Sequence, residues 1–298
     1  MSEIESLGAA LTAADLSTTT VRRRRGIGKK WRNPIGIVGA IIVLATVVMA
    51  ITAPLISPYS PSDGKAKRLL GPSWKHLVGT DELGRDTFSR IVYGARVSVQ
   101  VSLIAVFVAL LVGGLFGLAS GYFGGWLDSV IMRFVDILFA FPGLVLAIVI
   151  AGLLGPSRTN AMIAIGVIYA PAFARVIRGS VLSVMSEPYV ESDRVIGATH
   201  ARIIFRTILP NVVAPTIVLT SVYLSSAVLA EAGLSFLGLG AQPPEPSWGG
   251  MLNDARTYMQ NSPWMAIAPG AAIMLLVLGL NFLGDGLRDI LDPRLRTR

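Results

Sequence analysis

Long apolar blocks alternate with polar stretches along this sequence, which leaves few folds open to it. A block of about 20 apolar residues can cross the hydrocarbon core of a bilayer as an α-helix, which satisfies its backbone polar groups internally. The composition agrees, since 53% of the 298 residues are hydrophobic and only 15% are charged, compared with about 25% in soluble domains. The sequence therefore predicts an all-α membrane protein with one transmembrane domain over residues 31–298.

Six of the blocks are long enough to be transmembrane helices. We expect them at residues 34–56, 97–122, 131–154, 161–177, 211–232 and 265–283. The first block is longer than the apolar region of a signal peptide, so it predicts an uncleaved span. Residues 1–21 are rich in Ser, Thr and Ala without periodicity, and we expect residues 1–30 to be a disordered cytoplasmic tail. The stretch 80–96 has helical spacing, with a helix start expected at Thr80 and Asp81.

Lysine and arginine are distributed unevenly between the loops, and this bias predicts the orientation. If the N-terminus is cytoplasmic, the inner loops and both tails hold 17 of the 26 Lys and Arg residues. Both termini and segment 186–210 are then expected in the cytoplasm. The basic run Arg22–Arg25 would suit a nucleic acid, but directly before the first span it acts as a topological anchor. We therefore expect no nucleic-acid partner.

The sequence contains no arrangement of residues typical of a catalytic or metal site. It has no cysteine, and its two histidines, His76 and His200, are far apart and lack ligand spacing. Its glycine-rich stretches follow no predicted strand and carry no Lys-Ser/Thr pair, so no phosphate-binding loop is expected. We predict no catalytic residue, no metal and no cofactor in this chain. The rival hypothesis is a secondary transporter or channel acting alone, which would be expected to carry buried charges near mid-span or broken helices. The centres of the six expected spans contain almost no charged residues.

A few charged residues lie within or near the expected spans, where ionisable groups are costly. Asp136 follows Arg133 by three residues, which favours a local ion pair over a substrate contact. Glu231 lies near the outer end of the fifth span and either bonds loop backbone or lines a vestibule. A charged cluster near the C-terminus is expected to form an ion-pair network, and it consists of Asp285, Arg288, Asp289 and Asp292.

Segment 186–210, SEPYVESDRVIGATHARIIFRTILP, is too polar for hydrocarbon but has a helical pattern. Ser186 can cap a first helix with Pro188 in its first turn, and Gly197 permits a break after about two turns. Thr199 can cap a second helix that Pro210 ends or redirects into the fifth span. The apolar face expected in that second helix consists of Ala201, Ile204, Phe205 and Ile208. A solvated connector and a docking element both fit this pattern.

The same segment resembles the cytoplasmic coupling loop of ABC importer permeases. That loop follows a pattern of Glu-Ala-Ala, three residues, Gly, nine residues, Ile, one residue and Leu-Pro. The matching positions here are Glu191, Gly197, Leu209 and Pro210. The chain departs from the pattern at three positions, because Ser192 and Asp193 replace the two alanines and Thr207 replaces isoleucine.

Four other stretches resemble the C-type permease subunit of dipeptide and oligopeptide importers. They are VGTDELGRDTFSRIVYGARVS (78–98), GYFGGWLDSVIMRFVDILFAFPGLVL (121–146), EAGLSFLGLGAQPPEPSWGGML (231–252) and NFLGDGLRDILDPR (281–294). With segment 186–210 they extend the resemblance over roughly residues 30–298. The resemblance implies structural roles for the motif residues Gly79, Asp81, Gly84, Arg85, Asp86, Pro210, Glu231, Asp285 and Arg288.

The resemblance implies a permease with six transmembrane helices and the type I ABC importer fold, in the plasma membrane of a prokaryote. Such a subunit pairs with a second permease and rests on two cytoplasmic subunits that bind ATP and Mg. An extracytoplasmic binding protein delivers the substrate, expected to be a dipeptide or oligopeptide, with nickel or another small solute left open. Each coupling loop sits in an ATPase groove, and by analogy we assign that contact to Tyr189, Glu191, Asp193, Gly197, Ala198 and His200.

Overall fold

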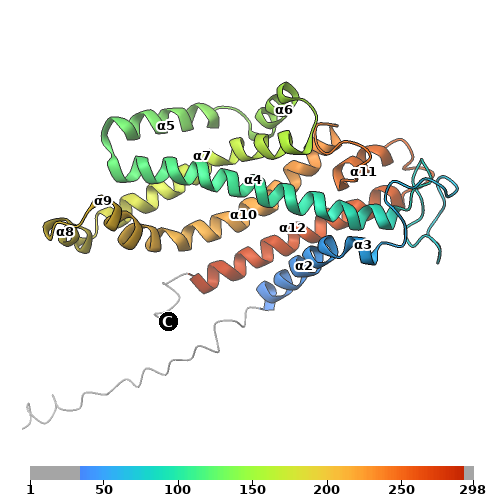
Figure 1. The fold of residues 1–298 in the computed structure, drawn as a ribbon, viewed down its shortest axis with the longest axis horizontal. Coiled ribbons are helices and arrows are strands. Elements are labelled where there is room, and N and C mark those ends of the chain that lie inside the picture. Colours follow the sequence, from blue (N-terminus) through green and yellow to red (C-terminus); the bar gives the residue numbers. More distant parts are fainter. Residues whose placement is uncertain (1–33, 292–298) are drawn as a thin grey trace, which may run out of the picture. The chain divides into compact units, whose positions relative to one another are not determined.

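The computed structural model describes residues 34–291, and the regular structure in this range is helical (Figure 1). The helices are α2 (Pro34–Ile51), α3 (Ala53–Ile56), α4 (Thr87–Phe123), α5 (Gly125–Phe139), α6 (Gly143–Leu154), α7 (Arg158–Met185), α8 (Pro188–Val195), α9 (His200–Arg202), the π-helical η2 (Ile203–Ile208), α10 (Leu209–Phe236), α11 (Trp248–Ala255) and α12 (Trp264–Leu291). An isolated β-bridge joins Thr80 and Asp86. The tail expected at residues 1–30 lies outside the described residues.

Five helices within residues 34–291 are long and apolar enough to cross a membrane. They are Pro34–Ile51, Thr87–Phe123, Arg158–Met185, the continuous helix His200–Phe236 and Trp264–Leu291. The pair α5 and α6 is a sixth span if it is counted as one, and its two helices are bent by 90°. The single helix expected over 131–154 is thus two helices. Pro142 explains the break, because its backbone is extended (ψ 124°) and proline disfavours helical backbone at the preceding residue.

The 37-residue helix α4 packs against α7 along a row of glycines. Gly113, Gly117 and Gly121 recur every four residues on the face of α4 that meets α7. A side chain at Gly117 would place its Cβ 3.0 Å from the Cα of Ala174, and closer still to the carbonyl oxygen of that residue. Small residues at this spacing let two membrane helices approach until their backbones touch. The glycines therefore set the distance between α4 and α7.

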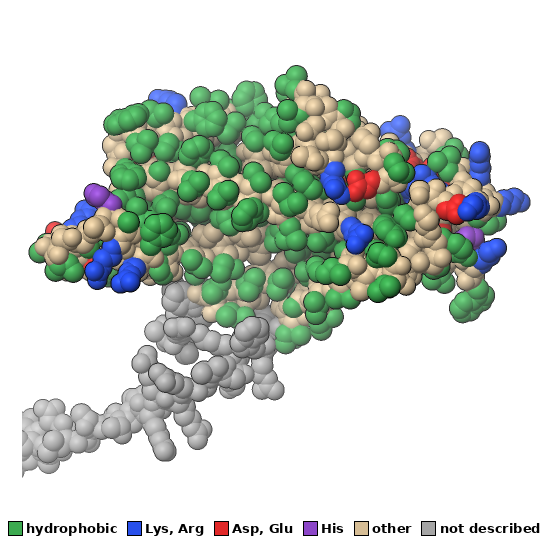
Figure 2. All heavy atoms as spheres, viewed as in Figure 1, with side chains coloured by type: hydrophobic (Ala, Val, Ile, Leu, Met, Phe, Trp, Pro, Cys, Tyr) green, Lys and Arg blue, Asp and Glu red, His purple; other side chains and the backbone are tan. Residues whose placement is uncertain are grey.

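Polar elements lie at the two ends of the transmembrane helices (Figures 1 and 2). Helices α8 and α9 lie at one end, which we call the α8 end, and basic side chains and a histidine gather there in Figure 2. Loop 57–86 and α11 lie at the opposite end, which we call the loop end. Helix α2 begins and α12 ends toward the α8 end (Figure 1). This is the arrangement expected if both termini share the side of segment 186–210.

Helix α4 begins at Thr87, later than the start expected at Thr80 and Asp81. The Asp86 carboxylate caps it by accepting hydrogen bonds from the N–H of Ser89 (2.8 Å) and from the Ser89 hydroxyl (2.7 Å). A capping carboxylate satisfies N–H groups that the first turn of a helix leaves without partners. Asp86 therefore fixes the start of α4, and the earlier start expected from spacing is wrong.

Candidate functional site

Segment 186–210 forms two helices joined by a bend, at the α8 end of the described residues. The first helix, α8, follows Glu187, whose backbone is extended, and carries Pro188 in its first turn as expected. The cap expected at Ser186 is wrong by one residue, because the Ser186 hydroxyl donates to the Ser183 carbonyl (2.8 Å) at the end of α7. Helix α8 then runs for eight residues, or about two turns.

Gly197 makes the bend, as its place in the sequence predicted. Its φ of 77° is left-handed, a conformation that is strained for residues with a Cβ. The N–H groups of Gly197 and Ala198 donate to the carbonyls of Arg194 (3.0 Å) and Asp193 (2.9 Å). These two bonds form a Schellman motif, which pairs carbonyls that the end of a helix leaves free. Glycine is therefore required here to end α8 and turn the chain.

The second helix begins after Thr199, whose hydroxyl accepts a hydrogen bond from the N–H of Arg202 (3.3 Å). The cap expected at this position is confirmed. The helix does not end at Pro210, since α9, η2 and α10 form one continuous helix over His200–Phe236. Of the two roles considered for Pro210, an end or a redirection of the helix, neither is observed, although proline lacks the N–H that the interior of an α-helix uses.

The π-helical segment η2 changes which side chains of this helix face inward. A π turn places residues five apart on one face, in contrast to the three and four of an α-helix. Ile203 and Ile208 are accordingly buried (2% and 0% exposed), whereas Phe205 is 69% exposed. Ala201 is exposed as well. The apolar face expected from α-helical spacing is therefore wrong, apart from Ile208 and the half-buried Ile204.

Hydrophobic packing fastens α8 to the rest of the chain. Val190 is 1% exposed and belongs to the same hydrophobic core as Ile203 and Ile208. Burying one valine side chain contributes about 1.5–3 kcal/mol. Helix α8 is thus held against the beginning of the α10 span, although most of its other side chains are exposed.

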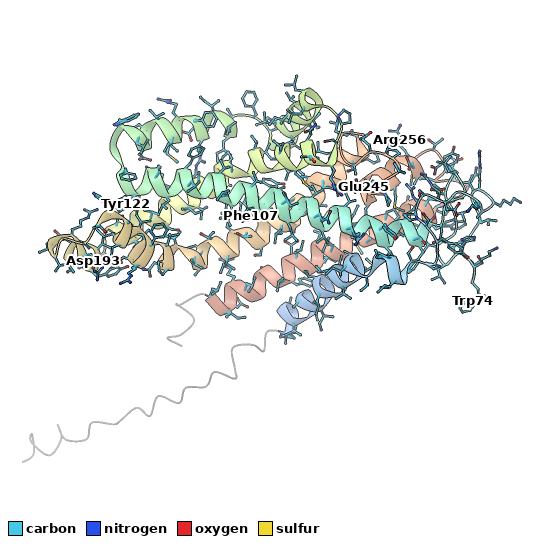
Figure 3. The ribbon with its side chains drawn as sticks, viewed as in Figure 1. Trp74, Phe107, Tyr122, Asp193, Glu245 and Arg256 are labelled. Atoms are coloured by element: carbon cyan, nitrogen blue, oxygen red, sulfur yellow. The ribbon has the colours of Figure 1, made fainter. Side chains whose placement is uncertain are left out.

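Two hydrogen bonds between side chains add to this packing. The Tyr122 hydroxyl, at the end of α4, lies 2.7 Å from Nδ1 of His200 in α9. The Thr207 hydroxyl, in η2, donates to Oδ2 of Asp193 in α8 over 2.7 Å. Tyr122 and Asp193 are both labelled at the α8 end in Figure 3. The segment is therefore tied to α4 through His200, and its two helices are tied to each other through Thr207.

The outer surface of α8 combines apolar and charged side chains. Val195 and Ile196 are 82% and 72% exposed, and Tyr189 is 46% exposed. A cavity of about 480 Å³ lies beside them, lined by Met185, Ser186, Glu187, Glu191, Arg194 and Val195. Exposed apolar side chains that lie together in a polar loop are typical of a surface that contacts another molecule.

The residues assigned to the docking contact fall into two groups. Tyr189, Glu191 and Gly197 are exposed on the segment. Asp193 and Ala198 are half-buried, and His200 bonds to Tyr122. Sequence reasoning did not single out Val195 and Ile196, although two apolar residues directly before the glycine of a polar loop were a visible signal.

Asp136 pairs with a residue far from it in sequence. Its Oδ1 lies 2.6 Å from Nη2 of Arg175 in α7, so the local pair expected with Arg133 is wrong. Asp128 and Arg178 form a second pair between the same two helices, with Oδ1 2.6 Å from Nε. These pairs tie α5 to α7. Local spacing along the sequence contains no sign of them, because the partners meet only once the two helices pack.

Glu231 is buried inside the helices and is 1% exposed. Its carboxylate accepts hydrogen bonds from the hydroxyls of Ser98 in α4 (2.9 Å) and Ser235 in α10 (2.8 Å). Neither alternative considered for it, loop backbone or a vestibule, is observed. Glu231 instead links α10 to α4.

The charged cluster at the end of α12 lies partly within the described residues. Asp285 and Arg288 are exposed there, and Asp289 follows them. Asp292 lies outside the described range. The ion-pair network expected at this end stays a prediction.

The motif residues at the loop end form a turn before α4. Left-handed φ values occur at Gly79 (79°) and Gly84 (76°). Asp81 accepts hydrogen bonds from the backbone N–H of Arg85 (2.8 Å) and from its Nε (2.6 Å), and both side chains are buried. Nδ1 of His76 lies 2.9 Å from Oδ1 of Asp86. These contacts agree with structural roles for Asp81, Arg85 and Asp86.

Three residues that sequence reasoning missed extend this turn into an ionic cluster. Glu82 accepts a hydrogen bond from Nη2 of Arg85 (2.8 Å), and Nε of Arg90 lies 3.4 Å from Asp81. Asp254 of α11 lies 3.6 Å from Nη2 of Arg90. The cluster therefore joins the start of α4 to α11. Burial raises the pKa of the Glu82 carboxyl above its ordinary value, and the nearby Asp81 carboxylate raises it further.

The raised pKa of Glu82 predicts that Glu82→Gln stabilises the protein at pH 8 but not at pH 4. A carboxyl whose pKa is higher in the folded state costs stability once the pH rises above its ordinary value. Glutamine removes that cost and keeps an oxygen that can accept from Arg85. The expected gain is below about 1 kcal/mol, since the group is partly solvated. Thermal melting of the two proteins in detergent at both pH values measures it, and a less stable variant at pH 8 contradicts it.

Comparison with known families agrees with the motifs. Residues 113–297 match the family described as binding-protein-dependent transport system inner membrane component. Residues 31–72 match the N-terminal transmembrane domain of oligopeptide transport permease C. The chain is similar over 70% of its length to a chain in an inward-facing structure of the MetNI methionine ABC transporter, covering 97% of that chain with a TM-score of 0.57. The sequence identity to it is 19%, so this likeness concerns the fold.

Two curated relatives cover nearly the whole chain. The dipeptide transport system permease protein DppC of Alkalihalophilus pseudofirmus is 48% identical over 267 residues, which are 89% of this chain and 88% of that protein. The glutathione transport system permease protein GsiD of Pectobacterium atrosepticum is 42% identical over 294 residues, which are 95% and 98% of the two chains. The resemblance to C-type permeases is thereby confirmed. The chain belongs to the family of binding-protein-dependent transport system inner membrane components, and it is the multi-pass permease of a bacterial ABC importer whose ATPase activity lies in partner subunits.

Proposed function

We propose that this permease forms half of a translocation pathway for dipeptides or oligopeptides. The other half is a second, related permease, and an extracytoplasmic binding protein delivers the peptide. Two cytoplasmic subunits bind ATP and Mg and supply the energy. The similarity to permeases named for dipeptide and glutathione transport supports a peptide as the transported solute, because glutathione is also a small peptide.

Segment 186–210 carries the proposal that energy enters the chain through a contact with an ATPase. A segment that transmits force needs an exposed contact surface and a firm connection to the spans. Tyr189, Val195 and Ile196 supply exposed apolar surface, and Glu191 supplies an exposed charge. The second helix of the segment continues without interruption into α10 and bonds to α4 through His200. We infer that residues 189–200 dock on the ATPase and that α10 and α4 receive its movement.

Transport assays on the reconstituted complex test the substrate. The chain, its second permease, the ATPase subunits and the binding protein are placed in proteoliposomes with ATP on the ATPase side. We expect ATP-dependent uptake of a labelled dipeptide or of glutathione. Uptake of Ni²⁺ without uptake of any peptide would refute the peptide assignment, and solute uptake by the chain alone without ATP would favour an independent transporter.

A further inference from the structure

Two of the three residues that depart from the coupling-loop pattern are in contact with each other. Asp193 stands where the pattern has alanine, and Thr207 stands where it has isoleucine. The Thr207 hydroxyl donates to Oδ2 of Asp193 over 2.7 Å, and both residues are half-buried. The third departure, Ser192, is exposed and bonds back to the Pro188 carbonyl within α8 (3.1 Å). A hydrogen-bonded pair in this chain thus replaces an apolar pair in the pattern.

This hydrogen bond spans the bend at Gly197. Asp193 lies before the bend in α8, and Thr207 lies after it in η2, 14 residues along the chain. Gly197 has open space where its side chain would be, and glycine restricts the backbone least of all residues. A bond that crosses such a bend limits the angle between α8 and the helix that leads into α10. The bond between Tyr122 and His200 lies after the bend and leaves this angle free.

The π turn of η2 brings Thr207 into reach of α8. Compared with an α-helical turn, a π turn contains one extra residue and therefore rotates the following side chains by about 100°. Ile203 and Ile208 are buried on the inner face of η2, and Thr207 lies next to Ile208 with its hydroxyl on Asp193. Single π turns within α-helices are frequent at functional sites.

We propose that Asp193 and Thr207 are positioning residues that hold α8 at a fixed angle to α10. Movement of a docked ATPase then rotates α10 and is not absorbed at Gly197. The proposal rests on the docking role proposed above for residues 189–200. It assigns Asp193 a contact within the segment, in place of the ATPase contact that the pattern alone implied.

Spin-label distances test the rigidity directly. The chain has no cysteine, so labels attach only where cysteines are introduced. Val195 and Phe205 are 82% and 69% exposed and lie on opposite sides of the bend. Pulsed electron paramagnetic resonance on the full-length chain in lipid nanodiscs gives the distance distribution between labels at these two positions. We expect Thr207→Val, which removes the hydroxyl at similar volume, to broaden the distribution, and Thr207→Ser, which keeps the hydroxyl, to leave it unchanged. Equal distributions for the native and Thr207→Val chains overturn the proposal.

Transport by the whole complex tests the consequence. We expect Thr207→Val to lower the amount of labelled dipeptide imported per ATP by about fivefold, the effect of losing one partly exposed hydrogen bond to a charged group. Asp193→Ala/Thr207→Ile restores an apolar pair and is expected to recover most of this ratio, although each single change lowers it. Such non-additivity is typical of residues in direct contact. The proposal is overturned if Thr207→Val imports as much dipeptide per ATP as the native chain. It is also overturned if the double variant is as impaired as the two single changes added together.

The docking function and the role of the Asp193–Thr207 pair are tested by separate experiments. Co-purification of the ATPase subunits with the native chain tests the docking function, and their absence refutes that function. The label distances depend only on this chain and decide the role of Asp193 and Thr207 separately.

Discussion

Replacing Glu191 by arginine is expected to impair import strongly while the subunits still assemble. Glu191 is exposed in the first turn of α8 and lines the cavity beside Glu187 and Arg194. Arginine there reverses the charge that residue 191 offers to the proposed ATPase contact, and a mismatch of charge across an interface costs roughly several kcal/mol. A positive charge is also unfavourable near the N-terminal end of a helix. We expect uptake to fall by about tenfold or more, since every 1.4 kcal/mol of lost contact energy is a factor of ten.

Uptake and ATP hydrolysis in proteoliposomes measure this effect together. Binding protein loaded with peptide should no longer stimulate ATP hydrolysis by the Glu191→Arg complex. Arg202→Glu serves as the matched control, because it reverses an exposed charge two residues beyond the proposed docking range. Glu191→Gln separates the loss of charge from the change of shape. Native uptake and native stimulation of the ATPase in Glu191→Arg would show that this residue does not dock.

The second large effect is expected at Gly117, where even alanine should destabilise the fold. Its Cβ would lie 3.0 Å from the Cα of Ala174, and closer still to the carbonyl oxygen of that residue. Backbone cannot move aside as a flexible side chain does, so α4 and α7 must separate. Overpacking of this kind costs about 1–3 kcal/mol, or more where the structure is rigid.

Gly114 provides the control on the same helix. An alanine Cβ at Gly114 meets only the ends of the Ile177 and Leu110 side chains, at 3.5 and 3.9 Å. Alanine is also favoured over glycine within a helix, by about 1 kcal/mol. We expect Gly114→Ala to melt at or above the native temperature in detergent and Gly117→Ala to melt well below it. Equal melting temperatures would rule out the close contact between α4 and α7.

Features that depend on neighbouring residues in the sequence could be predicted. The apolar blocks indicated the transmembrane helices, and Gly197 and Thr199 indicated the bend and the second cap of segment 186–210. Each of these depends on a few consecutive residues whose propensities agree. The break at Pro142 also had a visible signal, the sequence Phe-Pro-Gly within an apolar block. The block is long enough for one span, and this length led to the prediction of a single helix.

Features that depend on packing could not be predicted in the same way. Asp136 lies nearest to Arg133 in sequence, yet it pairs with Arg175 because α5 and α7 lie side by side. The contact between Asp193 and Thr207 requires both the bend and the π turn. Helical periodicity assumes 3.6 residues per turn, so it assigns the wrong inner face wherever a π turn intervenes.

The glycine row on α4 restricts how this permease can change shape. Sliding of one helix along another requires side chains that can exchange neighbours, whereas the glycines of this row lie directly against carbonyl oxygens of α7 and against the Cβ atoms of Phe173 and Val181. If α4 slid along α7 by less than the helical rise of one residue, carbonyl oxygens of one helix would already collide with Cα atoms of the other. We therefore expect α4 and α7 to move together as one rigid body. Tyr122, at the C-terminal end of α4, connects this body to α9 through its hydrogen bond with His200. We therefore expect any change of shape during transport to be a rotation of α4 and α7 together against their neighbours, with hinges outside this pair.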